Sequence, residues 1–257
     1  MPASPPETTE KPPFRAMTRL YVDLALVPGQ ELELPASSAH HARSVLRLAR
    51  DTDVVLFDGR GAVHEARLTL VARESVRALV GNAIEVTTES PLDVSLVQSI
   101  SRGDRMDYTI QKAVELGVRR IVPVTTRRTV VRLDARRADK RLEHWRGVLQ
   151  HAAEQSGRAL LPELAPVTSL EAWLAAHGGA GGFLLHPAAA NPLARQPPPA
   201  VPVVLFAGPE GGFDEAEVER LARAGVTSVS LGPRILRTET AAVCALAVMQ
   251  ALWGDLA

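Results

Sequence analysis

The chain has 257 residues, of which 46% are hydrophobic and 23% are charged, a balance that excludes a wholly disordered protein. Its 29 basic and 29 acidic side chains leave no net charge, and its one cysteine, Cys244, excludes an intramolecular disulfide and a multi-cysteine zinc site. The longest apolar stretch, 241–253, is shorter than the ~20 residues of a membrane span. We expect no signal peptide and therefore predict a cytoplasmic protein.

Positive charge is concentrated in the middle of the chain. Residues 101–160 contain 14 Lys and Arg side chains but only 7 Asp and Glu side chains. This excess favours an electropositive surface patch of the kind that contacts nucleic-acid phosphates. The alternative interpretation is a solvated helix face together with a loop.

The first 89 residues divide into a tail and a β-rich domain. Residues 1–16 are rich in Pro, Glu and Thr and lack an apolar period, so we expect a disordered tail, with Met17 as an alternative start. In residues 17–89, short apolar segments alternate with turn pairs such as Pro28-Gly29 and Asp58-Gly59. This spacing predicts a small β-barrel or meander.

One helix is expected within the β-rich domain, over residues 37–50, with Ser37-Ser38 as its cap. Its expected inner face is apolar and consists of Ala42, Val45, Leu46 and Ala49. Its expected outer face is basic and consists of Arg43, Arg47 and Arg50. Three arginines without interleaved acids favour contact with phosphate groups, and a solvated face is the alternative.

Beyond Ser90-Pro91, strands and helices alternate. Strands are expected at 92–100, 119–126, 181–187, 203–207 and 226–232. Helices are expected at 104–116, 141–157, 214–225 and from Thr238 onward. The alternation predicts an α/β domain over residues 90–257, in which helices cover both faces of a parallel sheet.

Three loops that follow strands of this domain have unusual compositions. They are residues 185–187, the turn Gly208-Pro209-Glu210-Gly211-Gly212 and residues 231–240. Ligands bind at loops that follow the carboxyl ends of parallel strands. Glycines in such a loop let its backbone approach the ligand closely. Acids in and after the second loop disfavour a phosphate and suit a positively charged ligand. A simple tight turn is the alternative.

The third loop leads into the last helix, for which Thr238 is the expected cap. Arg234 and Arg237 stand three residues apart before it, and we expect one of them to stabilise negative charge on a substrate. Pairing with Glu239 is the structural alternative. The motifs of ATP-binding, dinucleotide-binding and zinc-protease sites are absent, so we assign no metal.

Two helices carry polar faces opposite their apolar ones. The face of helix 104–116 consists of Asp104, Tyr108, Gln111, Lys112 and Glu115. The following helix offers His144, His151 and Gln155. Both faces are interpreted either as solvated surfaces or as surfaces that contact RNA or brace loops.

Four segments in this order resemble the signatures of one bacterial family. They are RGDRMDYTIQKAVELGV (102–118), EQSGR (154–158), GPEGGF (208–213) and LGPRILRTETA (231–241). Together they are similar to the 16S ribosomal RNA uracil-N3 methyltransferases, which belong to the SPOUT superfamily. The segments HHARSVLR (40–47) and LFDGRG (56–61) resemble the PUA-like barrel of the same family.

The resemblance implies a deep trefoil knot in the C-terminal domain, a homodimer with the last helix in its interface, and 16S ribosomal RNA as the partner. It further implies that three loops hold S-adenosylmethionine. The implied cofactor-binding residues are Leu185, His186, Gly208, Pro209, Glu210, Gly211, Gly212, Leu231, Gly232, Ile235, Leu236, Arg237 and Thr238. The predicted RNA-binding residues are Arg43, Arg47, Arg50, Arg102, Arg105, Lys112 and Arg158.

The implied reaction is attack of uridine N3 on the methyl group. We expect Arg237 to stabilise the charge that develops on the base. Glu210 and Glu239 are both candidates for removal of the N3 proton, and water is a third. The rival functions are methylation of a ribose hydroxyl or a tRNA base by the same fold, and RNA binding without catalysis during ribosome assembly.

Overall fold

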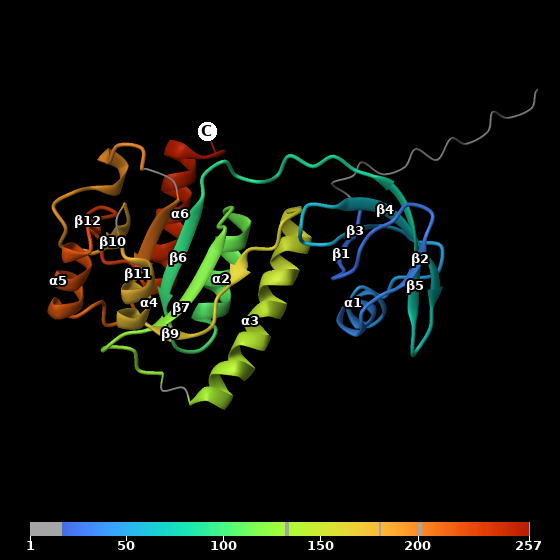
Figure 1. Ribbon diagram of the computed structural model, residues 1–257, viewed down its shortest axis with the longest axis horizontal. Helices are drawn as coiled ribbons and strands as arrows, with labels where there is room; N and C mark the ends of the chain where they lie inside the picture. The colour runs from blue at the N-terminus through green and yellow to red at the C-terminus, as the bar shows by residue number, and fades with distance from the viewer. Residues whose placement is uncertain (1–16, 132–133, 180, 200–201, 257) are drawn as a thin grey trace, which may run out of the picture. The chain divides into compact units, whose positions relative to one another are not determined.

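The computed structural model describes residues 17–131, 134–179, 181–199 and 202–256, which form two compact units (Figure 1). The first unit extends to Thr87 and also includes residues 157–160, and the second contains 88–156 and the chain after 160. The tail expected at 1–16 lies outside the described residues. Within those ranges, every helix is too short or too polar to cross a membrane.

The first unit is built on a five-stranded sheet with the order β1-β3-β4-β5-β2. Its strands are β1 (Arg19–Tyr21), β2 (Glu31–Glu33), β3 (Asp53–Phe57), β4 (Val63–Val71) and β5 (Val76–Ala83). Only the β1–β3 pair is parallel. Alternate residues such as Val54, Leu56, Ala66 and Leu68 form its core, as expected from the period of two in strands. The β-rich character predicted for this part of the chain is confirmed.

The helix expected over 37–50 is shorter than predicted. It consists of α1 (Ala36–His40) and one π-helical turn, η2 (His41–Val45), and the chain then bends at Arg47, whose φ is +53°. A left-handed residue cannot continue a right-handed helix. Ala42 is buried as predicted, but Val45, Leu46 and Ala49 are exposed. The three arginines therefore do not share one helical face.

The second unit contains a seven-stranded, wholly parallel sheet with the order β12-β10-β11-β6-β7-β8, in which β9 also pairs with β7. The strands are β6 (Val94–Ser99), β7 (Arg120–Thr125), β8 (Glu163–Leu164), β9 (Thr168–Ser169), β10 (Phe183–Leu185), β11 (Val203–Ala207) and β12 (Thr227–Val229). The predicted parallel α/β domain is confirmed. The knot stays a prediction, because strand order does not specify how the chain threads.

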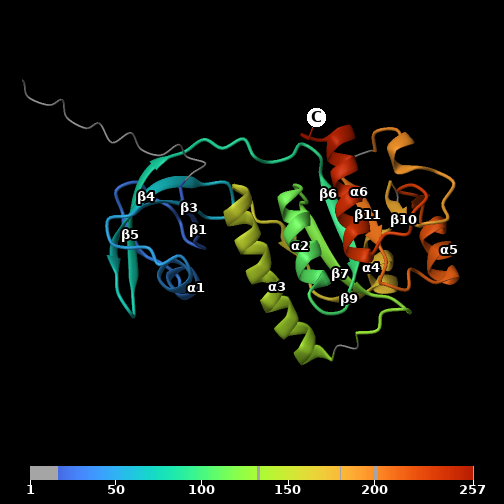
Figure 2. The same ribbon diagram turned by 180° about the vertical axis from the view of Figure 1, so that it is seen from behind.

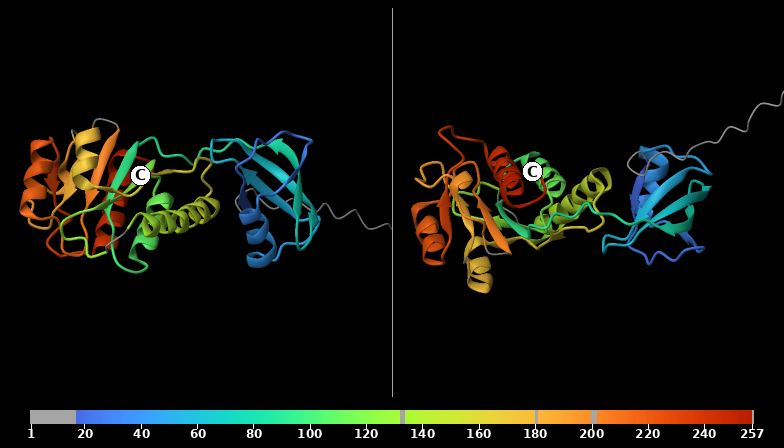
Figure 3. Two further views of the ribbon diagram at one scale, coloured as in Figure 1. Left: turned by 60° about the horizontal axis from the view of Figure 1, so that its bottom comes forward. Right: turned by 90° about the horizontal axis from the view of Figure 1, so that it is seen from above.

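Helices cover both faces of this sheet. They are α2 (Arg105–Glu115), α3 (Ala135–Ser156), α4 (Leu170–His177), α5 (Glu215–Arg223) and α6 (Thr238–Trp253), with a short 3-10 turn η3 (Leu193–Arg195). Figures 2 and 3 show α2 beside α6 on one face and α4 and α5 on the other. Leu170, Trp173 and Leu221 pack from α4 and α5 against the sheet. On α2, the predicted apolar face of Met106, Ile110, Ala113 and Val114 is buried.

The elements between residues 161 and 180 were not predicted. The strands β8 and β9 have only two residues each, too few to show a period. Helix α4 (LEAWLAAH) is mostly apolar and lacks the polar face that would mark it as amphipathic. Tertiary packing against the sheet stabilises these segments.

Candidate functional site

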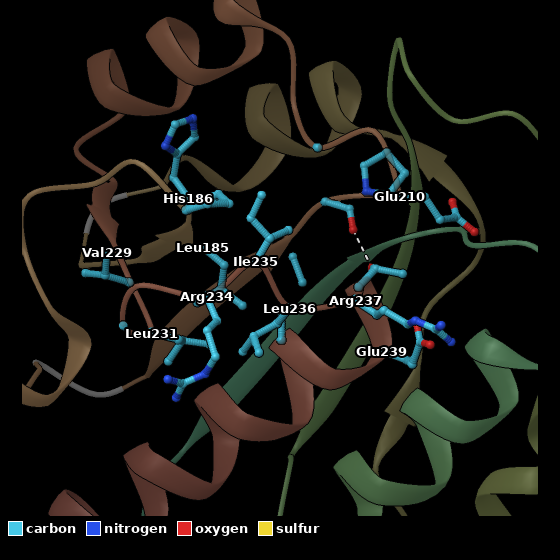
Figure 4. A pocket seen from close by; sticks show the side chains of 18 of the residues that line it. Leu185, His186, Glu210, Val229, Leu231, Arg234, Ile235, Leu236, Arg237 and Glu239 are labelled. Atoms are coloured by element: carbon cyan, nitrogen blue, oxygen red, sulfur yellow. Dashed lines mark hydrogen bonds between the residues drawn. The ribbon is translucent and has the colours of Figure 1, made fainter.

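Three loops of the second unit converge on one cavity of about 460 Å³. They follow β10, β11 and β12, and β10 pairs with both of the other strands, so the three carboxyl ends meet at one edge. These are the loops that the sequence analysis identified, and their predicted convergence is confirmed. Figure 4 shows Glu210 and Glu239 at one end of the cavity and His186 and Leu231 at the other.

The start of α6 joins two of these loops. The hydroxyl of Thr238 donates to the carbonyl of Gly208 (2.6 Å) and accepts from Nε2 of the buried Gln98 (3.2 Å). Thr238 is the first residue of the helix rather than its cap, a position that Arg237 occupies without a side-chain hydrogen bond. The prediction that Thr238 caps α6 was therefore wrong, since its hydroxyl is used between loops.

The glycines of the second loop have different roles. A Cβ at Gly208 would lie 3.1 Å from the ring of Phe213 and 3.2 Å from Cα of Gly212, so a side chain there would crowd the turn. Gly212 has a φ of +69°, which favours glycine. Gly211 does not line the cavity: its carbonyl accepts from Nη1 of Arg128 (2.8 Å), on the other side of the turn.

All the other predicted cofactor-binding residues line the cavity. They are Leu185, His186, Gly208, Pro209, Glu210, Gly212, Leu231, Gly232, Ile235, Leu236, Arg237 and Thr238. Val229 adds to their apolar surface, whereas Arg105 was not expected here. Arg105 is the first residue of α2 and lies far in sequence from all three loops. No local sequence pattern predicts that it lines the cavity.

Of the acids expected around the second loop, only Glu210 is among the residues that line the cavity. Glu217 is buried, where its carboxylate accepts from the backbone N–H groups of Arg127 (2.8 Å) and Asp214 (2.9 Å). Asp214 accepts in turn from the N–H of Glu217 (2.7 Å), which completes the predicted capping box of α5. These two acids stabilise the helix start and do not face the cavity.

Glu210 is held by donors from the start of α2. Its Oε1 accepts from the backbone N–H of Arg102 (3.0 Å) and from Nη1 of Arg105 (2.6 Å). Burial raises the pKa of Glu210. The pKa is nevertheless lowered overall, because Glu210 accepts hydrogen bonds from Arg102, from its own backbone N–H and from Arg105, and lies beside the positive charge of Arg105. The carboxylate therefore stays ionised and is a weak proton acceptor.

Glu239 lies on the other side of Arg105, with its Oε1 3.8 Å from Nε of the guanidinium. Its side chain is 15% exposed, and its buried Oε2 has no hydrogen-bond partner among the described residues. Pairing of Glu239 with Arg234 or Arg237 was the structural alternative, but Glu239 pairs with Arg105, and both of those arginines are exposed. Both carboxylates thus line the cavity, Glu210 hydrogen-bonded to its donors and Glu239 held by the longer ion pair.

The remaining predicted RNA-binding residues differ in availability. In the first unit, Arg47 and Arg50 are exposed, and the guanidinium of Arg43 donates to the carbonyls of Ala72 and Arg73. Arg158 is only 2% exposed, so its side chain is not available to RNA, contrary to the prediction.

In the second unit, Arg102 is exposed, and Lys112 pairs with Glu115 (2.7 Å) along one face of α2. This spacing of three residues is that of a solvated helix pair. Arg105 is committed to Glu210 and Glu239, so its place is at the cavity rather than on an open phosphate-binding face.

Two family models match the chain. An RNA methyltransferase domain matches residues 88–250, and an RNA methyltransferase PUA domain matches residues 34–80. The first match covers the parallel sheet and all three loops of the cavity. The second covers most of the five-stranded sheet of the first unit.

Individual proteins resemble the chain over most of its length. It is 29% identical over 252 residues to ribosomal RNA small subunit methyltransferase E of Bacillus subtilis (91% of this chain, 96% of the relative). Its identity to the Mycobacterium tuberculosis protein of that name is 32% over 241 residues, 90% of each. The crystal structure of the Neisseria gonorrhoeae protein of that name, bound to S-adenosyl methionine, has a TM-score of 0.87 and 40% identity (94% of this chain, 100% of that one).

Proposed function

The chain belongs to the family of RNA methyltransferases, and from this premise we propose that it transfers a methyl group from S-adenosylmethionine to N3 of a uridine in 16S ribosomal RNA. The convergence of three strand-end loops on one cavity supports a single small-molecule site. The names of the relatives support RNA of the small ribosomal subunit. The choice of uridine N3 rests on the resemblance of the sequence motifs and on the polar groups beside the cavity.

The residues of the cavity fit S-adenosylmethionine, which the Neisseria relative binds. Leu185, Leu231 and Ile235 offer apolar surface for an adenine ring, and the cavity volume lies within the range of about 300–1,000 Å³ typical of small-ligand sites. The ionised Glu210 suits the positive charge of the sulfonium and ammonium groups. When bound, S-adenosylmethionine supplies a methyl group activated by its positively charged sulfur.

The side chains at one end of the cavity suit methylation of an imide nitrogen. N3 of uridine is weakly nucleophilic until its proton is removed, and the negative charge then spreads to O2 and O4. We assign proton removal to Glu239, because it lines the cavity and its Oε1 is held only by a 3.8 Å ion pair with Arg105. Glu210 is the poorer base, because its pKa is lowered by its donors. Arg237, at the same end, is positioned to stabilise the anion.

Access to N3 requires an unpaired base. In a paired uridine this atom is hidden by the partner base, so the target must be single-stranded or rotated out of its helix. The family's PUA domain, matched at 34–80, supports a role of the first unit in holding the RNA. A substrate in the small ribosomal subunit also supports a cytoplasmic location for the proposed activity.

We further propose that the chain acts as a homodimer through α6. One face of this helix is buried in its own unit, but Val243, Ala247 and Val248 are only half-buried and Leu252 is 46% exposed. Small and apolar side chains of this kind allow close helix packing. Sedimentation equilibrium of the full chain tests this: a mass equal to one chain at micromolar concentration would contradict it.

Nucleoside mass spectrometry tests the proposed activity. Small-subunit RNA from a strain without the gene is expected to lack one N3-methyluridine, and the purified protein with S-adenosylmethionine is expected to restore it. Loss of a ribose-methylated nucleoside, or of a modified tRNA base, would favour another methyltransferase activity. A complete nucleoside set in the deletion strain, with no cofactor binding by calorimetry, would favour an assembly factor without catalysis.

The exposed arginines of the first unit permit a test of RNA binding. Replacing Arg47 and Arg50 together with glutamate is expected to weaken binding to 16S RNA and to reduce the salt slope by about one for each phosphate that these side chains neutralise. Binding is measured by filter retention at several salt concentrations. The matched control is Arg223→Glu, at the exposed end of α5. An unchanged slope in the double variant would show that these arginines are only solvated.

A further inference from the structure

A second cavity adjoins the first. It has a volume of about 950 Å³ and lies between the start of α2, the segment after β7 and the start of α6. Arg105, Glu210, Arg237 and Glu239 line both cavities, so the two meet at these four side chains. A group bound in the second cavity would therefore lie next to whatever occupies the first.

The shared end of the second cavity has a definite hydrogen-bonding character. Arginine side chains only donate, and an ionised carboxylate only accepts. Arg105 and Arg237 thus supply donors, and the carboxylate of Glu239, whose Oε1 lies 3.8 Å from Nε of Arg105, supplies an acceptor. The edge of uracil around N3 has the complementary pattern, with an N–H donor between two carbonyl acceptors. Cytosine has no N–H at N3 and would leave the carboxylate unpaired.

Two exposed hydrophobic side chains also line the second cavity. Tyr108 on α2 is 46% exposed, and Val130 after β7 is 52% exposed, although both are large hydrophobic side chains. Tyr108 is presented by a helix whose opposite face, including Met106 and Ile110, is fully buried. A tyrosine ring on such a rigid support is a suitable stacking surface for a base.

The segment that carries Val130 is also held in place. The hydroxyl of Thr129 lies 3.0 Å from that of Ser99 at the end of β6. The backbone N–H of Arg127 donates to the buried carboxylate of Glu217 (2.8 Å). The two apolar walls of the cavity thus come from separate elements that are each fixed to the core.

We propose that the second cavity binds the base of the target uridine, with its ring stacked on Tyr108 and its N3 edge facing Arg105, Glu239 and Arg237. This inference rests on the proposed function and adds a substrate-binding residue to it. Tyr108 provides affinity for the base, and the shared polar end provides selection for uracil. Neither interaction requires a change in the cofactor cavity.

Steady-state kinetics of Tyr108→Ala and Tyr108→Phe test the inference. The substrate is small ribosomal subunits purified from a strain without the gene, and cofactor affinity is measured separately by calorimetry. In Tyr108→Ala the KM for subunits is expected to rise about 5- to 150-fold, the range produced by removal of a base–aromatic stack, with cofactor affinity unchanged. Tyr108→Phe keeps the ring and is expected to behave like the wild type. The control is Arg223→Ala, an exposed position on α5 that lines neither cavity.

Crosslinking gives a readout that does not depend on turnover. Irradiation of the full chain with 16S RNA containing 5-bromouridine is expected to label the peptide that contains Tyr108, and Tyr108→Ala is expected to reduce that label. An unchanged KM in Tyr108→Ala, an equal defect in Tyr108→Phe or a change of oligomeric state would overturn the inference. The proposed function fails separately, if the wild-type protein produces no N3-methyluridine.

Discussion

Replacement of Arg237 with alanine is expected to reduce kcat for methylation of small-subunit RNA by about 100- to 1,000-fold, the cost of removing one preorganised donor to a developing anion. Arg237 lines both cavities and stands at their common end. Its guanidinium is exposed, so the variant leaves no buried partner behind. The measurement is single-turnover methyl transfer with saturating subunits and cofactor.

The control for this variant is Arg223→Ala, which removes an exposed arginine from α5 without touching either cavity. Thermal unfolding of both variants is expected to match the wild type, because neither side chain contributes to the core. Cofactor affinity in Arg237→Ala is expected to change much less than kcat, since the backbone of the third loop is retained. Wild-type turnover in Arg237→Ala would remove this residue from the reaction.

The variant Glu239→Gln is expected to lower kcat by about 100- to 10,000-fold at neutral pH, the usual contribution of a positioned general base. Glutamine keeps the size of the side chain but cannot take the N3 proton. The deficit relative to the wild type is expected to shrink as the pH rises, because hydroxide then removes the imide proton without the carboxylate. The measurement is the pH dependence of single-turnover rates.

The variant Glu210→Gln is the informative comparison. Its carboxylate has a lowered pKa and accepts from Arg102 and Arg105, so it holds charge and geometry rather than moving a proton. Its replacement is expected to weaken cofactor binding, with no narrowing of the rate deficit at high pH. If the pH effect appeared in Glu210→Gln and not in Glu239→Gln, the two roles would have to be exchanged.

Local patterns in the sequence determined much of this protein. The alternation of strands and helices after Ser90 predicted the parallel sheet of the second unit, because burial on both faces requires continuous apolar strands. The strand ends then predicted the three loops, since carboxyl ends of parallel strands meet at one edge. The capping box at Asp214 and Glu217 was also predicted from the sequence, because it depends on a spacing of three residues.

Contacts between distant residues were decided only by the tertiary structure. The placement of Arg105 between Glu210 and Glu239 joins residues more than a hundred positions apart, and no local pattern encodes it. The same holds for the burial of Arg158 and for the cavity that Tyr108 shares with Val130. Periodicity and turn chemistry act over a few residues, so they determine elements and loops. Which charges meet, and which side chains remain open to a ligand, depends on how those elements pack.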